Sequence, residues 1–491
     1  MRTIVCIDLL SLPTSSDKPD LGQVRPSGPP NKGLLRMRDR DLRPPDRHQA
    51  TSKSVVTLVL GLVVALVAGA CSGAGGGGGG GATTITLAAV DNPSMADLKK
   101  LLPDFESSHS NIKVNIVTLP EDQLRQQVTQ DVAAKSGRYD LFTIGTYEVP
   151  LWAKKGWIEN LGPFIAKDSS YAPDDLIPGI SGALSYKNNL YAVPFYGESS
   201  MLMYRKDLLA AKGQTMPDHP TWDQVATIAQ AVNTPSLSGI CLRGLPGWGE
   251  QLAPLDTVVN TFGGRWFDEK WNAQLNTPQW KAAVTFYTTL LKNAGEPGAG
   301  NAGFTECLNA YNSDKVAMWY DATVAASFFT GDAAKNSGYA YAPTKVKDWS
   351  GWLWAWSLGM PSSSKKKDAA WTFADWATSK DYAKLVGTKL GWSRVSPGTR
   401  TSTYAIPEYQ AAAGAFAQVT LDSIAHADVN HPTVDPVPYI GVQYVDIDEF
   451  QQLGDQVSQE FAKVIAGGQS VDQALAKAQT LATAVGKVYQ H

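Results

Sequence analysis

Residues 84–145 read TITLAAVDNPSMADLKKLLPDFESSHSNIKVNIVTLPEDQLRQQVTQDVAAKSGRYDLFTIG and alternate strand-like with helix-like patterns. The apolar runs at 84–90, 114–117 and 139–145 have the length and composition of buried strands. Between them, apolar residues recur every three or four positions, as on one face of a helix, and we expect the second helix to end at Gly137. This order of strands and helices predicts an α/β fold with a parallel sheet and right-handed crossovers.

Polar side chains follow each of these three strands. Asp91 and Asn92 come after the first strand, Glu121 after the second and Glu148 after the third. Because the ligands of parallel sheets gather outside the carboxyl ends of the strands, we expect a ligand site at this edge.

The chain before this sheet has the layout of an export signal. Residues 55–70 contain the uncharged run VVTLVLGLVVALVA followed by small residues, which matches the h-region and cleavage site of a signal peptide. A helix of that run would span about 21 Å, short of the about 30 Å of a bilayer core, which favours a signal peptide over a permanent transmembrane helix. Residues 1–54 lack apolar periodicity, and we interpret them as a disordered extension or as sequence upstream of the true translation start.

Cys71 stands between these small residues and the glycine run from Gly75 to Gly81. Small residues ending in a cysteine resemble the lipobox of bacterial lipoproteins, although Ala68 stands where such motifs usually carry leucine. The resemblance implies that Cys71 carries the lipid that anchors the protein to the outer face of the cell membrane, with residues 71–82 as a flexible tether. The alternative is that Cys71 is an ordinary small residue within a signal anchor.

Charge and motif content exclude several classes of function. The full chain has a net charge of −3, and residues 1–54 are basic, so the rest is acidic. This argues against nucleic acid or an anionic membrane surface as partner. CxxC pairs, HExxH, GxSxG and Walker A motifs are absent from the sequence, and we expect no metal, no cofactor and no catalytic residue. Cys241 and Cys307 are either joined by a disulfide, which we expect of an exported protein, or remain two buried thiols.

Tryptophan is abundant, with 15 residues, and several lie in motifs that also contain charged side chains. Carbohydrate sites combine flat apolar faces with Asp, Glu and Arg that pair with hydroxyl groups, so this composition suggests a sugar-like ligand. Each candidate has a structural alternative. Trp354 would stack on a ligand or pack a core, Arg394 would bind two hydroxyls or form an ion pair, and Asp321 would accept ligand hydroxyls or cap the following segment.

Two longer motifs resemble an extracellular solute-binding protein of family 1, the capture component of a carbohydrate ABC importer. They are NLYAVPFYGESSMLMYRKDLL at 189–209 and DKVAMWYDAT at 314–323. Within that family, GICLRGLPGWGE at 239–250, NTFGGRW at 260–266 and the two cysteines look most like the branch that binds sorbitol and mannitol.

The resemblance implies a two-lobed, type II periplasmic-binding-protein-like fold with hinge-linked lobes and a helical C-terminal part. Lobe one would comprise residues 83–194 and 322–358, and lobe two residues 195–321 and 359–491. The protein would be a monomer that binds a polyol or sugar between its lobes and delivers it to the transmembrane permease subunits. Binding of a mono- or disaccharide is one alternative, a secreted glycoside hydrolase is a second, and an adhesin or structural lipoprotein is a third.

The matching motifs and strand ends also imply which side chains line the ligand site. The expected ligand-binding residues are Asp91, Asn92, Glu121, Glu148, Tyr196, Glu198, Arg243, Trp248, Asn260, Asp321, Trp354 and Arg394.

Overall fold

The computed structural model describes residues 81–349 and 351–490. The extension 1–54, the signal at 55–70, the predicted lipid anchor Cys71 and all but the last residues of the tether lie outside the described residues. Within the described part of the chain, no helix is both long and apolar enough to cross a membrane.

A five-stranded sheet forms the core of lobe one. Its strands stand in the order β2 (Ile112–Leu119), β1 (Thr83–Val90), β3 (Leu141–Ile144), β10 (Trp354–Gly359) and β6 (Ala192–Glu198). β1 pairs in parallel with both β2 and β3, which confirms the predicted parallel start of the fold. β10 runs antiparallel to β3 and β6. The carboxyl ends of β1, β2 and β6 and the amino end of β10 therefore meet at one edge of the sheet.

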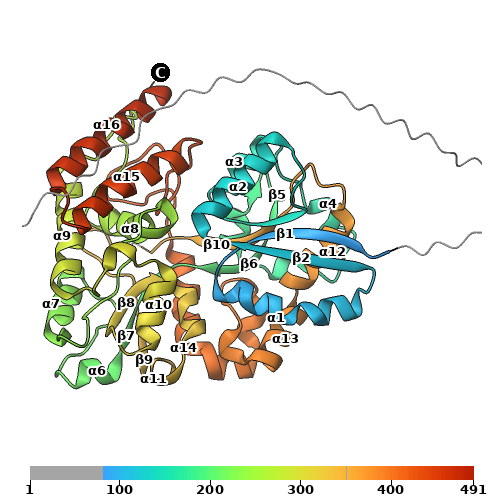
Figure 1. The fold of residues 1–491 in the computed structure, drawn as a ribbon, viewed down its shortest axis with the longest axis horizontal. Helices are drawn as coiled ribbons and strands as arrows, with labels where there is room; N and C mark the ends of the chain where they lie inside the picture. The colour runs from blue at the N-terminus through green and yellow to red at the C-terminus, as the bar shows by residue number, and fades with distance from the viewer. Residues whose placement is uncertain (1–80, 350, 491) are drawn as a thin grey trace, which may run out of the picture. The chain divides into compact units, whose positions relative to one another are not determined.

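Helices cover both faces of this sheet (Figure 1). α2 (Glu121–Ala134) and α3 (Glu148–Lys154) lie above it in that view, and α1 (Pro93–Ser108) and α13 (Lys380–Leu390) lie below it. α12 (Lys367–Thr378) packs against β1 and β6. The expected end of α2 at Gly137 is wrong, because Lys135 already adopts the left-handed conformation (φ 53°) and its backbone N–H bonds the last turn.

Lobe two is built on a smaller antiparallel sheet. β7 (Ser200–Arg205) lies between β8 (Met318–Ala322) and β9 (Ser337–Tyr341). The larger helices around it are α7 (Trp222–Val232), α8 (Ala253–Thr261), α9 (Pro278–Ala294), α10 (Phe304–Asn312), α15 (Phe450–Ile465) and α16 (Val471–Tyr489). The shorter helices of lobe two are α6 (Lys206–Ala210) and α11 (Gly331–Asn336). Lobe one contains the short elements α4 (Gly162–Ile165), α5 (Pro178–Ala183), β4 (Ser185–Tyr186) and β5 (Asn189–Leu190).

The chain first crosses between the lobes at Ser199, which separates β6 from β7. This is a few residues later than the expected boundary after residue 194. The second expected boundary is also displaced: residues 322–358 do not all belong to lobe one, because β9 pairs with β7 in the second sheet and only β10 returns to the first. Strand pairing decides which sheet a segment joins, and a motif near the crossing does not reveal that pairing.

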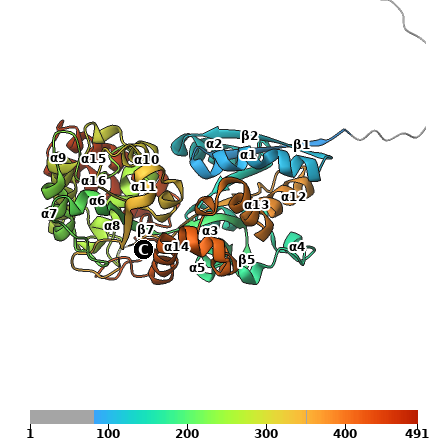
Figure 2. The same cartoon turned by 90° about the horizontal axis from the view of Figure 1, so that it is seen from below.

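Residues 359–491 likewise do not form one body in lobe two. α12 and α13 both pack against α1 in lobe one, whereas α15 and α16 pack against α9 in lobe two. α14 (Pro407–His426) contacts both β6 and β7 and lies between the two groups of helices, as Figure 2 shows. The C-terminal part is helical, as predicted, but it is shared between the lobes.

A disulfide joins the cysteines that we expected to pair. The Cα atoms of Cys241 and Cys307 are 5.7 Å apart, and the bond closes a sequence separation of 66 residues in lobe two. The disulfide ties the strand-like segment beside β8 to α10.

Replacing both Cys241 and Cys307 by alanine is expected to lower the free energy of unfolding by about 4 kcal/mol, because a loop of this length loses substantial entropy when it is closed in the unfolded chain. Urea denaturation of the oxidised protein, the reduced protein and the double variant measures the difference. Equal midpoints for all three would contradict the stabilising role of the bond.

Candidate functional site

A cavity of about 200 Å³ lies between the lobes, at the edge where the strand ends of lobe one meet. Lobe one contributes residues that follow β1 and β2 and residues of β6 and β10, and lobe two contributes the segment after Cys241 and the start of α10. The lining residues are Val90, Asp91, Asn92, Pro120, Glu121, Tyr196, Glu198, Arg243, Leu245, Glu250, Phe304, Thr305, Glu306, Ala322, Val324 and Trp356.

Arg243 and Asp321 form an ion pair in the lobe-two wall. Arg243 donates from Nε to Asp321 Oδ2 at 2.8 Å and from Nη2 to Asp321 Oδ1 at 2.5 Å. The two residues face each other because Cys241 pairs in parallel with Trp319, so positions two residues further along are also neighbours. Asp321 is fully buried and does not line the cavity, so its role is to hold the Arg243 side chain in position.

Arg243 also reaches two other groups of lobe two. Its Nη1 donates to the carbonyl oxygen of Gly249 at 3.0 Å and to Glu250 Oε2 at 3.3 Å. A guanidinium has five N–H donors, and these bonds together with the Asp321 pair use four of them. The remaining N–H belongs to Nη2 and bonds no group among the described residues.

Two glutamates next to Arg243 are held in a low-dielectric setting. Burial raises the pKa of Glu198 well above its ordinary value, with Asp321 and Glu121 adding to the effect and Arg243 opposing it. Burial likewise raises the pKa of Glu250 to about 8, against the influence of Arg243. Glu198 Oε2 is buried and has no hydrogen-bond partner among the described residues. A carboxyl group in this position is a ready partner for a ligand hydroxyl.

Asn92 and Tyr196 are fixed against each other in the lobe-one wall. Asn92 Nδ2 donates to the Tyr196 hydroxyl at 3.0 Å, while its Oδ1 accepts from the backbone N–H of Met95 and caps α1. The backbone N–H of Asp91 is bonded to Leu119 at the end of β2, and its side chain is exposed. Asp91 and Asn92 line the cavity at the strand end where the sequence placed them, and Tyr196 lines it from β6.

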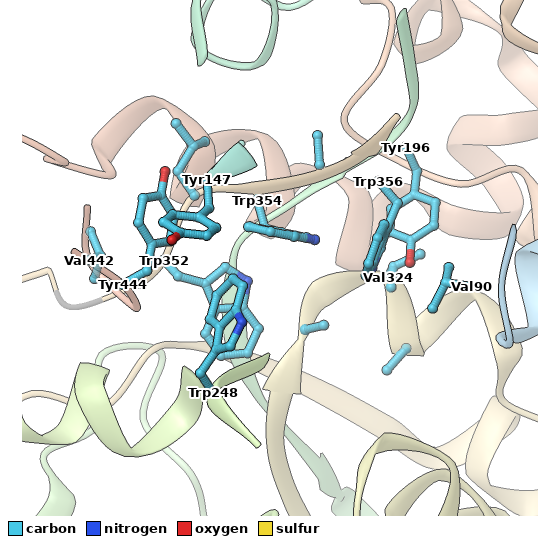
Figure 3. Packing of buried hydrophobic residues seen from close by; sticks show 14 of the residues in the cluster. Val90, Tyr147, Tyr196, Trp248, Val324, Trp352, Trp354, Trp356, Val442 and Tyr444 are labelled. Carbon is cyan, nitrogen blue, oxygen red and sulfur yellow. The ribbon is translucent and has the colours of Figure 1, made fainter. Parts of the chain in front are cut away.

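Trp248 and Trp354 do not line the cavity but pack beside it. Their rings are 5.8 Å apart and edge-on, and the next tryptophan along β10, Trp356, lies 5.6 Å from Trp354 (Figure 3). Only Trp356 of these three lines the cavity. It is the aromatic surface on which C–H groups of a ligand can pack.

Three further expected ligand residues are engaged elsewhere. Glu148 accepts from Arg125, which lies outside the cavity lining. Asn260 donates to the carbonyl oxygen of Val442 at 2.7 Å. Arg394 donates from Nε and Nη2 to Asp97 Oδ2, at 2.9 and 2.5 Å, beside a separate cavity of only about 40 Å³. For Arg394, the contact that is made is the ion pair given above as its structural alternative.

Ten of the lining residues were not predicted, among them Glu250, Phe304, Glu306, Val324 and Trp356. Glu250 is the last residue of the motif GICLRGLPGWGE, and Trp356 is the last residue of WLWAW at 352–356. These segments indicate the region of the site but do not reveal which of their side chains line it. Phe304 and Glu306 stand at the start of α10, where the sequence carries no signal for a ligand.

One cluster of potential metal ligands occurs in the described part of the chain, and it is explained by the disulfide. Cys241, Cys307 and Glu296 lie within ligand distance of one another, but both sulfurs are used in the Cys241–Cys307 bond. The cavity, by contrast, combines several carboxyl groups, one remaining N–H of Arg243 and the aromatic side chain of Trp356. Such a set binds a neutral polyhydroxy compound by complementary hydrogen bonds and C–H packing.

Comparison with known proteins places the chain in a family. The sequence signature described as "Bacterial extracellular solute-binding protein" matches residues 89–384. The mannitol-binding protein of Pseudomonas aeruginosa is 48% identical over 405 residues, which cover 81% of this chain and 92% of that protein.

Solved structures agree in fold. An ABC transporter solute-binding protein from Agrobacterium vitis S4 with bound D-mannitol is 49% identical, has a TM-score of 0.81 and aligns over 83% of this chain and 99% of its own. A ribitol complex from Agrobacterium radiobacter K84, at 23% identity and a TM-score of 0.72 over 83% and 99% of the two chains, shares the fold. The two-lobed, periplasmic-binding-protein-like α/β architecture predicted from the sequence is thereby confirmed, and the chain belongs to the bacterial extracellular solute-binding proteins.

Proposed function

We propose that the protein captures an acyclic polyol, with D-mannitol as the foremost candidate, in the cavity between its lobes and delivers it to the permease of an ABC importer. The observation that carries the proposal is the set of carboxyl groups around Arg243, in a chain nearly half identical to a protein named for mannitol binding and to one solved with D-mannitol bound.

The chemistry of the cavity supports a neutral ligand with many hydroxyl groups. Glu121, Glu198 and Glu250 can each pair with ligand hydroxyls, and Arg243 has an N–H left to donate. An anionic ligand would meet several carboxyl groups and a single arginine, so a sugar acid is disfavoured. Trp356 and Phe304 supply apolar faces for the carbon chain.

The ligand would act by shifting the balance between open and closed lobes. Because the lining residues come from both lobes, a bound ligand contacts both only when they are close together, and its binding energy then favours the closed form. The closed form would dock on the permease as a monomer, and the ligand would leave chemically unchanged.

Attachment to the membrane is the remaining part of the proposal. The apolar run, the small residues and Cys71 support lipidation of that cysteine, and the glycines that follow support a flexible tether on the outer face of the cell membrane. An extracytoplasmic location agrees with the family to which the chain belongs.

Isothermal titration calorimetry tests the ligand assignment. We expect D-mannitol to bind at one site per chain more tightly than ribitol, glucose or maltose, and to be recovered intact after incubation. Binding of maltose or glucose in preference to every polyol would overturn the polyol assignment. Breakdown of a disaccharide would instead support the glycoside hydrolase alternative.

A further inference from the structure

Arg125 is a buried cation next to the cavity, although it does not line it. The residue lies on the second turn of α2, and its side chain is only 4% exposed. Its Nε and Nη2 donate to Glu121 Oε1 at 3.1 and 2.8 Å, and its Nη1 donates to Glu148. Of these three residues, only Glu121 lines the cavity.

Three tryptophan rings surround the same guanidinium group. Its central carbon lies 4.1 Å from the ring centroid of Trp248 and 5.0 Å from those of Trp354 and Trp356. Trp354 and Trp356 belong to lobe one, on β10, whereas Trp248 comes from lobe two, and Figure 3 shows it approaching the other rings from below. Cation–π attraction strengthens when the pair is shielded from water, as it is here.

Trp248 is held firmly in lobe two. Its backbone N–H donates to Asp455 Oδ1 at 3.0 Å, and its ring packs edge-on against Phe450 at 5.8 Å. Both anchors belong to α15. Trp248 therefore moves with lobe two, and its distance from Arg125 changes when the two lobes move apart.

The glycines that flank Trp248 permit this close contact. A Cβ atom at Gly249 would overlap Glu121 Oε1 and lie 3.4 Å from Arg125 Nη2. Gly247 adopts φ 147°, which side-chain-bearing residues rarely adopt, and a Cβ there would lie 3.1 Å from the Asp122 carboxylate. Segment 247–249 of lobe two thus packs directly against the first turns of α2.

We infer that Arg125 is a positioning residue that couples ligand capture to lobe closure, because its guanidinium joins Glu121 of the cavity wall to Trp248 of the opposite lobe. A ligand hydroxyl bound by Glu121 holds that carboxylate in the orientation that aligns Arg125 with Trp248. When the lobes separate, Trp248 withdraws and one face of the guanidinium loses its aromatic partner. The inference rests on the proposed function, since it needs a ligand that occupies the cavity.

Arg125→Lys keeps the charge but lacks the planar fork that bonds Glu121 and stacks on Trp248. We expect this variant to bind D-mannitol at least tenfold more weakly, through faster dissociation, and to lose most of the mannitol-induced change in tryptophan fluorescence. Arg400→Lys is the matched control. Arg400 is also buried, lies 4.7 Å from the Tyr171 ring and pairs with Asp175, but all of these contacts lie within lobe one.

Stopped-flow fluorescence and melting temperatures for the wild type and both variants test the inference. Slower closure and faster release in Arg125→Lys alone, with both variants losing some thermal stability, would support it. Wild-type binding kinetics in Arg125→Lys would overturn it, as would equal kinetic losses in Arg400→Lys.

A double-mutant cycle on melting temperature separates this inference from the proposed function, because it needs no ligand. The cycle compares Arg125→Lys, Trp248→Phe and the double variant, and we expect the combined loss to be smaller than the sum of the single losses. Additive losses would show that Arg125 and Trp248 do not stabilise each other across the lobes, and would overturn the inference. Failure of the wild type to bind any polyol, with the coupling intact, would contradict the proposed function alone.

Discussion

Arg243→Lys is expected to weaken D-mannitol binding by about 100-fold, or about 2.8 kcal/mol. Lysine retains the positive charge, but its single ammonium group cannot pair with both oxygens of Asp321 while also reaching Gly249 and the cavity. The loss therefore combines a missing hydrogen bond to the ligand with displacement of the neighbouring carboxyl groups. Isothermal titration calorimetry at constant pH and salt measures it.

Arg394→Lys is the matched control for this prediction. Arg394 also forms a forked ion pair, with Asp97, and its guanidinium lies over the Phe328 ring at 4.6 Å. Because it lies outside the cavity lining, we expect its substitution to change the affinity less than twofold. Loss of binding in Arg394→Lys with full binding in Arg243→Lys would show that the ligand does not occupy the cavity at Arg243.

Raising the pH from 5 to 8 is expected to lower the melting temperature of the ligand-free protein. The pKa of Glu250 is about 8 and that of Glu198 is also raised, against an ordinary value of 4.5. Between pH 4.5 and 8 the unfolded chain has released the Glu250 proton while the folded protein still holds it, so this group lowers stability by about 1.4 kcal/mol per pH unit. The raised pKa of Glu198 acts in the same direction. The stabilising effect is complete below pH 4.5 and is lost as the pH passes the folded-state pKa.

Burial also raises the pKa values of Asp256 and Glu296 in lobe two, so these groups add to the pH dependence of the melting temperature. Glu250→Gln isolates the part that comes from Glu250. Glutamine keeps an acceptor for the N–H groups of Arg243 and Phe304 but does not ionise. We expect its melting temperature to fall less steeply with pH than that of the wild type. Glu306→Gln, at an exposed position in the cavity lining, is the control and should follow the wild type. A wild-type slope in Glu250→Gln would mean that Glu250 is already ionised in the folded protein.

The sequence alone was sufficient for the fold class and for one wall of the site. Apolar runs of strand length, separated by apolar patterns of period 3.6, predict βαβαβ. The carboxyl ends of parallel strands must share an edge, which is enough to bring Asp91, Asn92 and Glu121 together. The signal at 55–70 and Cys71 belong to a segment that lies outside the described residues, and they remain predictions.

The tertiary structure decided what local patterns cannot encode, which is the partner of each charged or aromatic side chain. Asp321 and Arg243 are 78 residues apart, and only the parallel pairing of Cys241 with Trp319 makes them neighbours. The same kind of long-range pairing assigns Trp248 to Arg125 rather than to the cavity, and residues 337–341 to lobe two. Periodicity reflects which face of one element is buried, whereas a binding site depends on which elements are brought together, and that choice is made by packing across the whole chain.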